Sequence, residues 1–312
     1  MNILVVGGAG FIGSHCVDQY RADGHRVVVL DNLSSGRAEH LPEDVRLVVG
    51  DVRDRELVDS VFAEESFDLV NHHAAQLDVR VSVADPVYDA EQNILGSLVL
   101  LDAAAKHGVG RFVFASSGGT VYGDQQVFPA DESHPTDPIS PYGVSKLSVE
   151  KYLGYFHHQH GLRSVILRYT NIYGPRQNAH GEAGVVAIFC RRMLAGEGPV
   201  IYGSGEQTRD YVFVDDVARA NVAALHYLDE NERGIFNVAT AKETTVNDLF
   251  RHLNGMAGNR FEEKHASAKP GEQFRSVCTA AKAEREMGWL PKIGVEEGLQ
   301  KTWAYFRDQE SN

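Results

Sequence analysis

The chain has 312 residues, of which 43% are hydrophobic and 23% are charged, and its formal net charge is −13. This length allows a large buried core in one or two domains, and the composition is that of a globular protein rather than a disordered one. The acidic balance argues against a surface that coats nucleic acid, because phosphate backbones are held by Lys and Arg. It does not exclude a phosphate-bearing ligand in a locally positive pocket.

Targeting signals and membrane spans are not expected. No run approaches the ~20 apolar residues that cross a bilayer, and the first six residues lack the basic start and longer apolar stretch of a signal peptide. Cys16, Cys190 and Cys278 lie far apart without a CxxC pair, which predicts small buried side chains rather than disulfides or a zinc ribbon. We therefore expect a cytoplasmic protein without a membrane partner.

Short β-branched runs alternate with amphipathic stretches through the first half of the chain. Strands are predicted at residues 3–6, 26–30, 46–49, 69–72, 112–115 and 164–168, and helices at residues 12–21, 55–63, 93–106 and 144–160. Nearly all-apolar strands separated by helices are typical of a parallel sheet covered on both faces, so we predict a doubly wound α/β (Rossmann) fold.

Beyond residue 168 the alternation of predicted strands and helices becomes less regular. Residues 173–210 are rich in glycine and should form loops around one helix, whereas 213–228 is again helical, 235–238 is a strand, and the chain from about 245 is mostly helical. We expect a nucleotide-binding domain of residues 1–172, to which 211–241 return. A smaller, interleaved substrate-binding cap is expected from residues 173–210 and 242–312.

A glycine-rich loop follows the first strand. Gly7, Gly10 and Gly13 satisfy GxxGxxG, and Gly8 with the last two satisfies GxGxxG, between the first strand and the first helix. Glycines there let the backbone approach a pyrophosphate at a helix N-terminus. Asp31 ends the second strand, 18 positions after Gly13, where a carboxylate binds the adenine ribose hydroxyls and disfavours a 2′-phosphate. NAD is thus favoured over NADP; a turn or helix-cap role for Asp31 is the alternative.

Tyr142 and Lys146 form a YxxxK pair near the start of a predicted helix. Residues four apart share one helical face, and a nearby ammonium should lower the pKa of the phenol. Tyr142 is then a candidate general base for a substrate hydroxyl. A surface Tyr–Lys pair without function is the alternative.

Other groups of titratable residues are given structural roles. His72 and His73 are adjacent at a strand end, so their side chains should point to opposite faces, and further ligands at zinc spacing are not evident. Glu64-Glu65 and Asp215-Asp216 are expected on solvated faces or at helix caps. We expect no metal site.

The motifs together resemble the extended short-chain dehydrogenase/reductase family over nearly the whole chain. They are Gly-Gly-Ala-Gly-Phe-Ile-Gly from Gly7, Leu-Asp-Asn-Leu-Ser from Leu30, Ser-Ser-Gly-Gly-Thr-Val-Tyr-Gly from Ser116, Ser-Pro-Tyr-Gly-Val-Ser-Lys from Ser140, Leu-Arg-Tyr-Thr-Asn-Ile-Tyr-Gly-Pro-Arg-Gln from Leu167 and Gln-Thr-Arg-Asp-Tyr-Val from Gln207. Within the family the chain is most similar to the UDP-hexose 4-epimerases, particularly those of UDP-glucose. The resemblance implies a tightly held NAD, a UDP-sugar under the cap, and inversion at C4 through a 4-keto intermediate.

The resemblance also implies the residues of each site. The catalytic group is Ser117, Tyr142 and Lys146. The residues expected to bind NAD are Gly7, Gly10, Phe11, Ile12, Gly13, Asp31, Asn32, Ser35, Gly36, Asp51, Val52, His73, Ala74, Ala75, Asn93, Ser116, Tyr142, Lys146 and Tyr169. The residues expected to bind the substrate are Ser117, Tyr142, Asn171, Gly184, Val185, Tyr202, Arg209, Lys269, Glu272 and Ser276. For Arg209, an ion pair with Asp210 is the alternative.

One position departs from the family pattern. The family usually has Ser or Thr four residues before the Tyr of its Val-Tyr-Gly element, and here that residue is Gly118. Ser117, or else Thr120, is the candidate to contact the sugar O4. Gly118 and Gly119 also supply no acid or base for the elimination that related dehydratases perform.

Several alternatives stay open. They are a UDP-glucuronate 4-epimerase, an NAD-dependent nucleotide-sugar dehydrogenase, and a non-catalytic nucleotide-sensing protein on the same fold. The small Ser276 leaves room for an N-acetylated sugar. Relatives dimerise through two helices per subunit, here roughly residues 92–106 and 143–160, with Leu98, Leu101, Leu147 and Tyr155 expected on the outer faces.

Overall fold

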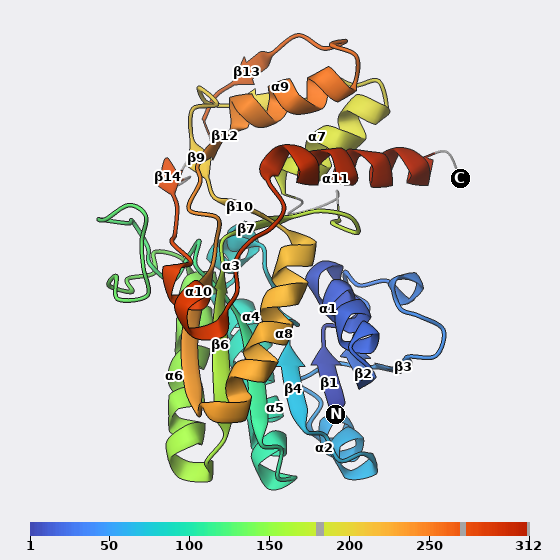
Figure 1. The fold of residues 1–312 in the computed structure, drawn as a ribbon, viewed down its shortest axis with the longest axis vertical. Helices are drawn as coiled ribbons and strands as arrows, with labels where there is room; N and C mark the ends of the chain where they lie inside the picture. The colour runs from blue at the N-terminus through green and yellow to red at the C-terminus, as the bar shows by residue number, and fades with distance from the viewer. Residues whose placement is uncertain (179–183, 269–272, 311–312) are drawn as a thin grey trace.

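The structure is a computed structural model that describes residues 1–178, 184–268 and 273–310. At its centre is a seven-stranded parallel sheet in the order β11-β6-β5-β4-β1-β2-β3 (Figure 1). The chain runs outward from β1 to β3 and then returns across the sheet, which is the doubly wound arrangement. The predicted fold class is confirmed. The strands are β1 (Asn2–Val6), β2 (Arg26–Asp31), β3 (Arg46–Val49), β4 (Leu69–His72), β5 (Arg111–Ser117), β6 (Arg163–Tyr169) and β11 (Arg233–Val238).

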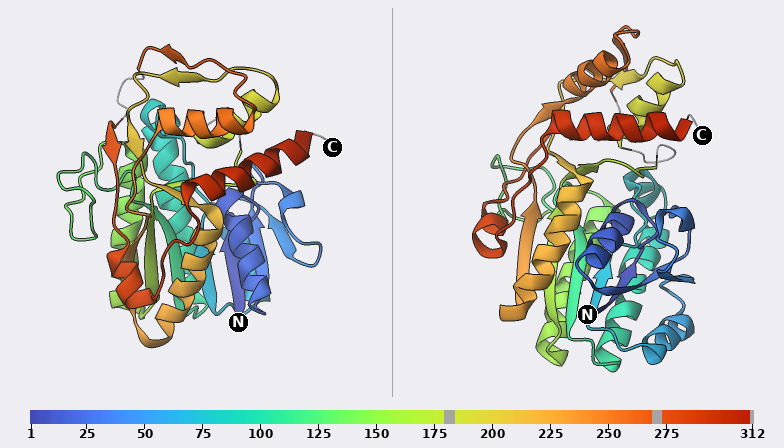
Figure 2. Two further views of the ribbon diagram at one scale, coloured as in Figure 1. Left: turned by 45° about the horizontal axis from the view of Figure 1, so that its top comes forward. Right: turned by 45° about the vertical axis from the view of Figure 1, so that its right-hand side comes forward.

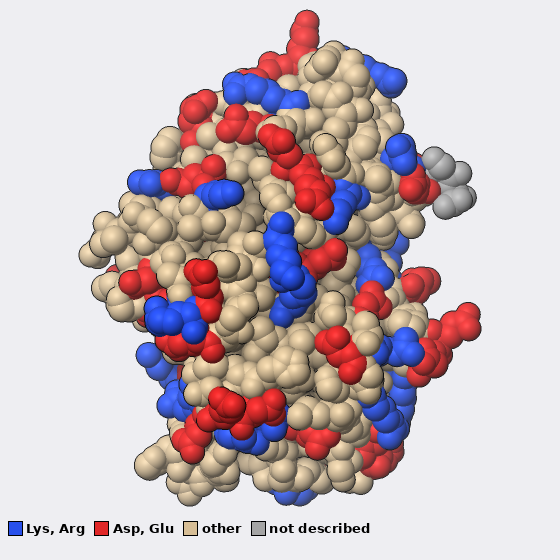
Figure 3. All heavy atoms as spheres, viewed as in Figure 1, with Lys and Arg blue, Asp and Glu red and all other residues tan. Residues whose placement is uncertain are grey.

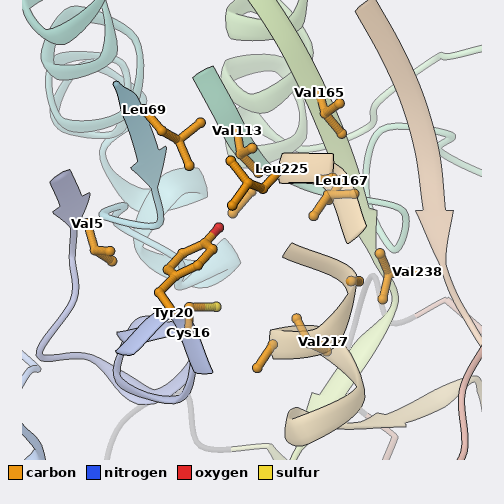
Figure 4. Packing of buried hydrophobic residues seen from close by; sticks show 14 of the residues in the cluster. Val5, Cys16, Tyr20, Leu69, Val113, Val165, Leu167, Val217, Leu225 and Val238 are labelled. Atoms are coloured by element: carbon orange, nitrogen blue, oxygen red, sulfur yellow. The ribbon is translucent and has the colours of Figure 1, made fainter. Parts of the chain in front are cut away.

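Helices cover both faces of the sheet, and alternate residues of each strand face opposite ways. Ile3 and Val5 join one core cluster, with α1 (Phe11–Ala22), α8 (Val214–Glu230) and α10 (Ala281–Met287). Leu4 and Val6 join the other, with α2 (Arg55–Glu64), α5 (Gly96–Lys106) and α6 (Pro141–His160). Figure 4 shows the first cluster, where side chains of α1 and α8 meet those of the strands. Each fully buried Val or Leu contributes ~1.5–3 kcal/mol, so both faces stabilise the sheet.

The connection from β4 to α5 differs from its prediction. α3 (Val79–Ala84), α4 (Pro86–Ala90) and a π-helical segment (Glu91–Leu95) precede α5, and a short 3₁₀ turn (Ala38–His40) follows β2. Helix α6 starts at Pro141 rather than residue 144, because Ser140 caps it by accepting a hydrogen bond from Gly143 N. Leu101, predicted on an outer face, is 0% exposed and belongs to the core, whereas Tyr155 is exposed as predicted.

A third hydrophobic cluster lies beyond the carboxyl ends of the strands (Figures 1 and 2). It joins α7 (Val185–Leu194), α9 (Val246–Met256) and α11 (Val295–Glu310). We call these helices, with the short strands β8, β9, β12, β13 and β14, the cap. β8 (Val200–Tyr202) pairs with β13 (Lys264–Ala266), β9 (Thr208–Arg209) lies between β12 (Thr244–Thr245) and β14 (Arg275–Ser276), and β7 (Asn171–Tyr173) pairs with β10 (Tyr211–Phe213).

Burial of polar residues confirms some expectations and corrects others. All three cysteines are buried and free, as predicted. Glu65 is the C-cap residue of α2, in agreement with the predicted cap role, but its side chain is not solvated: it is 7% exposed and pairs with Arg26 and Arg46. Asp216 is 0% exposed and is not solvated either. Figure 3 shows Lys and Arg side chains mixed with Asp and Glu over one face of the molecule. Among the described residues, no helix combines the length and apolar character that crossing a membrane requires.

Candidate active site

A cleft of about 710 Å³ opens where β1, β2, β4, β5 and β6 end. Ligands of doubly wound folds bind at this edge, because helix N-termini and loop residues converge there. Most residues predicted to bind NAD line it: Gly7, Gly10, Phe11, Ile12, Gly13, Asp31, Asn32, Ser35, Asp51, Val52, His73, Ala74, Ala75, Ser116, Tyr142, Lys146 and Tyr169. Ser117 and Asn171 line the same cleft.

The glycine loop fits its expected role because side chains have no room there. A Cβ on Gly7 would lie 2.5 Å from Ala74 N, and one on Gly13 would lie 2.2 Å from Gly7 O. Gly7 also has φ +78°, which favours glycine. Gly10 is the N-cap of α1 and brings no side chain to the helix end. The backbone and the positive end of the helix dipole are thus presented directly to the cleft.

Asp31 stands at the end of β2, is only 7% exposed, and faces the cleft. Its carboxylate accepts hydrogen bonds from Ala9 N at 3.0 Å and Leu33 N at 2.8 Å. Gly36 does not line the cleft but packs behind Asp31, since a Cβ there would lie 3.0 Å from both carboxylate oxygens. Asp31 therefore connects the glycine loop with the loop after β2. A structural role in the turn does not prevent the same carboxylate from binding a ligand in the cleft.

Tyr142 and Lys146 occupy the first turns of α6, one helical turn apart. Lys146 is 4% exposed; its Nζ donates to Ala115 O at 2.9 Å and lies 5.7 Å from the centre of the Tyr142 ring. Burial lowers the pKa of Lys146 to about 8, and the charge of Asp89 opposes that change. The pair therefore combines a phenol and a largely desolvated ammonium at the cleft wall, as a pKa-tuned acid–base site requires.

The structure of the loop after β5 distinguishes between Ser117 and Thr120, the two candidates to replace the hydroxyl that the family usually has at the position of Gly118. Ser117 is half-buried and lines the cleft, whereas Ser116 is buried and donates its hydroxyl hydrogen to Glu150 at 2.6 Å. Thr120 is not among the lining residues, and its buried Oγ1 has no hydrogen-bond partner in the part of the chain that the structure describes. Gly118 N donates to Tyr169 O at 2.7 Å, and a Cβ there would lie 3.2 Å from Arg168 O. A side chain at this position would therefore be in tight contact with the backbone of Arg168.

His73 presents polar atoms whose hydrogen-bonding capacity is unused. Its ring stacks on Tyr169, with centroids 6.3 Å apart, and neither buried ring nitrogen has a partner among the described residues. Burial, followed by the charge of Lys146, lowers the pKa of His73 to about 3, so the imidazole is neutral. His72 points to the opposite face and contacts Ser97, as predicted from their adjacency. Buried polar atoms without partners at a cleft wall fit a bound cofactor that would satisfy them.

Asn93 lies one layer behind the cleft. It is 3% exposed, donates to Gln76 O at 2.9 Å and to Asp89 Oδ1 at 2.9 Å, and accepts from Gln76 N. Gln76 itself lines the cleft. Asn93 therefore positions a lining residue rather than lining the cleft itself.

The predicted substrate residues are spread between this cleft and the cap. Arg209 lies on β9, in register with Ser276 on one side and Thr244 on the other. Tyr202 ends β8 and is 43% exposed. Gly184 and Val185 begin α7, whereas Lys269 and Glu272 lie outside the described residues. The Asp210 carboxylate turns to Thr240 and Ala241, from which it accepts hydrogen bonds.

Sequence reasoning missed lining residues in the loop after β7. Arg176, Gln177 and Asn178 face the cleft, and Arg176 has φ +66° and pairs with Asp18 of α1 at 2.7 Å. The Gly-Pro-Arg-Gln motif that ends at Gln177 could have indicated these lining residues, because it places an Arg next to a turn. Within the described ranges, three or more His, Cys, Asp or Glu side chains nowhere gather as metal ligands would.

Comparison with known proteins agrees with this geometry. A family model described as "NAD dependent epimerase/dehydratase family" matches residues 3–239. A putative UDP-glucose 4-epimerase of Methanocaldococcus jannaschii is 43% identical, over 98% of both chains. The solved UDP-glucose 4-epimerase of Thermotoga maritima with UDP-glucose has 46% identity and a TM-score of 0.96, covering 99% of this chain and 100% of that one. The Thermus thermophilus UDP-glucose 4-epimerase in complex with NAD has 44% identity and a TM-score of 0.92, covering 98% and 99%. By this match and by its cleft, the chain belongs to the NAD dependent epimerase/dehydratase family.

Proposed function

We propose that this chain is an NAD-dependent 4-epimerase that interconverts UDP-glucose and UDP-galactose. The observation that carries the proposal is the Tyr142–Lys146 pair, which lines the same cleft as the glycine loop and Asp31. Relatives of 43–46% identity with full coverage are named as UDP-glucose 4-epimerases, one putatively. Family membership alone allows dehydratases, but Gly118 and Gly119 provide neither acid nor base for eliminating water.

The residues present fit NAD. The glycine loop and the N-terminus of α1 would hold the pyrophosphate, Asp31 the adenine ribose, and His73 with Lys146 the nicotinamide end. When bound, NAD supplies the acceptor and donor of the C4 hydride.

The chain's own residues handle the proton. Tyr142, as phenolate, takes the proton from the sugar 4-hydroxyl, so that the O–H bond at O4 breaks as one forms on the tyrosine oxygen. The phenol later returns this proton to the oxygen of the 4-keto sugar. Lys146 stabilises the phenolate through its charge. Ser117 faces the cleft and would hold O4 through a hydrogen bond.

The cap would bind the rest of the substrate. In our proposal residues 1–172 and 211–241 form the cofactor domain, and residues 173–210 and 242–312 form the cap apart from α10, which packs on the central sheet. The cap has its own hydrophobic cluster. Arg209 would grip the diphosphate with Asn171, and Tyr202 would lie near the uracil. Ser276, in register with Arg209 and small, leaves open an N-acetylated sugar as a second substrate.

We also propose a homodimer formed by α6 together with the π segment and the α5 helix that follows it. Large apolar side chains are exposed on α4, the π segment, the loop before α6 and α6 itself: Val87, Leu95, Ile139, Val144 and Tyr155. An apolar groove of about 490 Å³ lies between α4, the π segment and the start of α6. Several exposed large apolar side chains on neighbouring elements are typical of an interface, and a second copy of the chain is the occupant that the family resemblance favours.

The test of the reaction uses the purified protein as it exists. Its released nucleotide should be NAD, and it should convert UDP-galactose to UDP-glucose without added cofactor. A dehydrogenase would instead need NAD in substrate amounts and accumulate NADH. UDP-glucuronate and UDP-N-acetylglucosamine belong in the same assay, since turnover of only the former would replace our proposal by the glucuronate alternative.

A further inference from the structure

Asp89, on α4, is a buried carboxylate to which neither the sequence nor the proposed chemistry gives a role. It is 0% exposed. Its oxygens accept three hydrogen bonds, from Ser145 Oγ at 2.6 Å, Asn93 Nδ2 at 2.9 Å and Gln76 Nε2 at 3.0 Å. All three donors are neutral, and Asp89 forms no salt bridge within the residues that the structure places. A buried charge without an ionic partner costs stability unless another charge compensates it.

The compensating charge is close along the chain. Ser145, which donates to Asp89, directly precedes Lys146, and Lys146 is 4% exposed. The ammonium donates to one carbonyl oxygen, Ala115 O, and lies over the rings of Phe114 and Tyr142 at 4.9 and 5.7 Å. No carboxylate lies within ion-pair distance of it among the described residues. Asp89 and Lys146 are therefore two buried opposite charges that make no direct contact but are linked through Ser145, which adjoins Lys146 in α6 and donates to Asp89.

The other titratable groups around Lys146 do not supply a negative charge. His72 and His73, at the end of β4, are neutral, because burial lowers the pKa of both. Tyr142 is the group that the ammonium is proposed to activate. Burial lowers the pKa of Lys146, and Asp89 is the charge that raises it.

We propose that Asp89 is a positioning residue of the reaction: it keeps Lys146 protonated through its charge and holds the first turns of α6 through Ser145. The same carboxylate also holds part of the cleft wall in place, because it accepts hydrogen bonds from Asn93 and from Gln76, which lines the cleft. Asp89 acts on Tyr142 only through Lys146. This inference rests on the proposed function, in which Tyr142 must lose a proton.

The test is Asp89→Asn, which removes the charge and preserves the shape. The amide oxygen can still accept from Asn93 and Gln76, and the Ser145 hydroxyl can turn to accept from the amide nitrogen. At an effective dielectric of ~20, a charge several ångströms away shifts a pKa by about one unit or more. The alkaline limb of kcat against pH, where Lys146 loses its proton, should therefore move about one unit lower, which narrows the profile. The acid limb should not rise, because Lys146 is protonated there in both proteins.

Ser145→Ala is the matched control, because it removes a hydrogen bond of Asp89 but no charge. It should leave both limbs in place. Equal shifts in the two variants, or an unshifted alkaline limb in Asp89→Asn, would overturn the proposal. Thermal melting verifies folding, and Asp89→Ser, which also lacks the charge, replaces Asp89→Asn should that variant fail to fold.

A titration without turnover separates this inference from the proposed function. The phenolate absorbance at 295 nm, taken as the difference between each protein and its Tyr142→Phe counterpart with NAD present, reports Tyr142 alone. Loss of Asp89 should move this titration to higher pH. If the parent protein converts no UDP-sugar, the proposed function fails, while the titration still decides whether Asp89 acts on the pair.

Discussion

At the scale of single residues, Tyr142 is the group on which the proposed proton transfer depends. Tyr142→Phe keeps the ring beside Lys146 but removes the oxygen that would accept the proton. We expect kcat to fall by about 10²–10⁴-fold, the usual contribution of a general base, while the NAD content of the purified protein stays unchanged. Tyr152→Phe, 39% exposed on the same helix, is the control and should be fully active. Undiminished conversion by Tyr142→Phe would refute the mechanism.

The lowered pKa of Lys146 leads us to expect that activity and stability respond to pH in opposite directions. Its pKa is lowered from 10.5 to about 8 because burial disfavours the charged form. Activity requires that form, so kcat should fall as the pH rises through about 8. Between about 8 and 10.5 the unfolded chain binds this proton and the folded one does not, so the contribution of Lys146 to stability rises with pH. Melting midpoints and kcat measured over pH 6–10 check the expected rise in stability and the expected fall in activity. If the melting midpoint of Lys146→Met still rose with pH in the same way, the rise could not be due to Lys146.

At the scale of elements, a buried ion pair fastens α6 to β6 behind the cleft. Glu150 accepts from Arg168 Nε at 3.0 Å and Nη2 at 2.6 Å, and both side chains are at most 4% exposed. Glu150→Ala leaves the guanidinium buried without its partner and should cost about 3–5 kcal/mol. Glu297→Ala, which breaks the exposed pair with Lys301, should cost at most about 1 kcal/mol. Urea unfolding of both variants at one NAD concentration compares them; equal losses would contradict this account.

The long elements could be predicted from sequence and the short ones could not. The inner strands of the sheet could be predicted because their burial on both faces gives continuous apolar runs. Strands such as β9 and β12 contain two residues each, so they carry no periodicity and form only where distant segments meet. The start of α6 was placed three residues late because the prediction followed its apolar pattern rather than the Ser140 cap and Pro141.

The same distinction holds for the site. Glycine spacing and Asp31 identified the cofactor side of the cleft, because these residues act where they stand in the chain. The Arg176 contact with Asp18 joins residues 158 positions apart, and the bonds of Asp89 join three segments. Asn93 was assigned to the cofactor but lies behind Gln76. Such relations follow from packing, which sequence spacing does not encode.

At the scale of the whole molecule, a buried carboxylate ties the C-terminal part of the chain to a helix that packs on the sheet. Asp216, at the start of α8, accepts hydrogen bonds at 3.0 Å from the backbone N–H groups of Lys292 and Ile293. Trp289 Nε1 donates to the carbonyl oxygen of the same residue at 3.0 Å. The segment that leads into α11, a helix of the cap, is thereby fixed to a helix that packs on the central sheet. Asp216 also pairs with Arg219, three residues on, but the expectation that it is solvated failed because its backbone partners Lys292 and Ile293 lie more than 70 residues away.

The last prediction concerns the proposed assembly of two chains. Leu95 is 53% and Tyr155 54% exposed, on the π segment and on α6. The double variant Leu95→Asp with Tyr155→Asp would place four charges in an interface between two copies, and desolvating them would cost more than the apolar contacts return. Light scattering after size exclusion should give the mass of two chains for the parent and 34.3 kDa for the variant. Leu290→Asp changes a residue 44% exposed beside α8, on the other side of the sheet, and should leave the dimer intact. A parent protein of 34.3 kDa would refute the proposed dimer. A double variant that stays dimeric would show that the interface lies elsewhere.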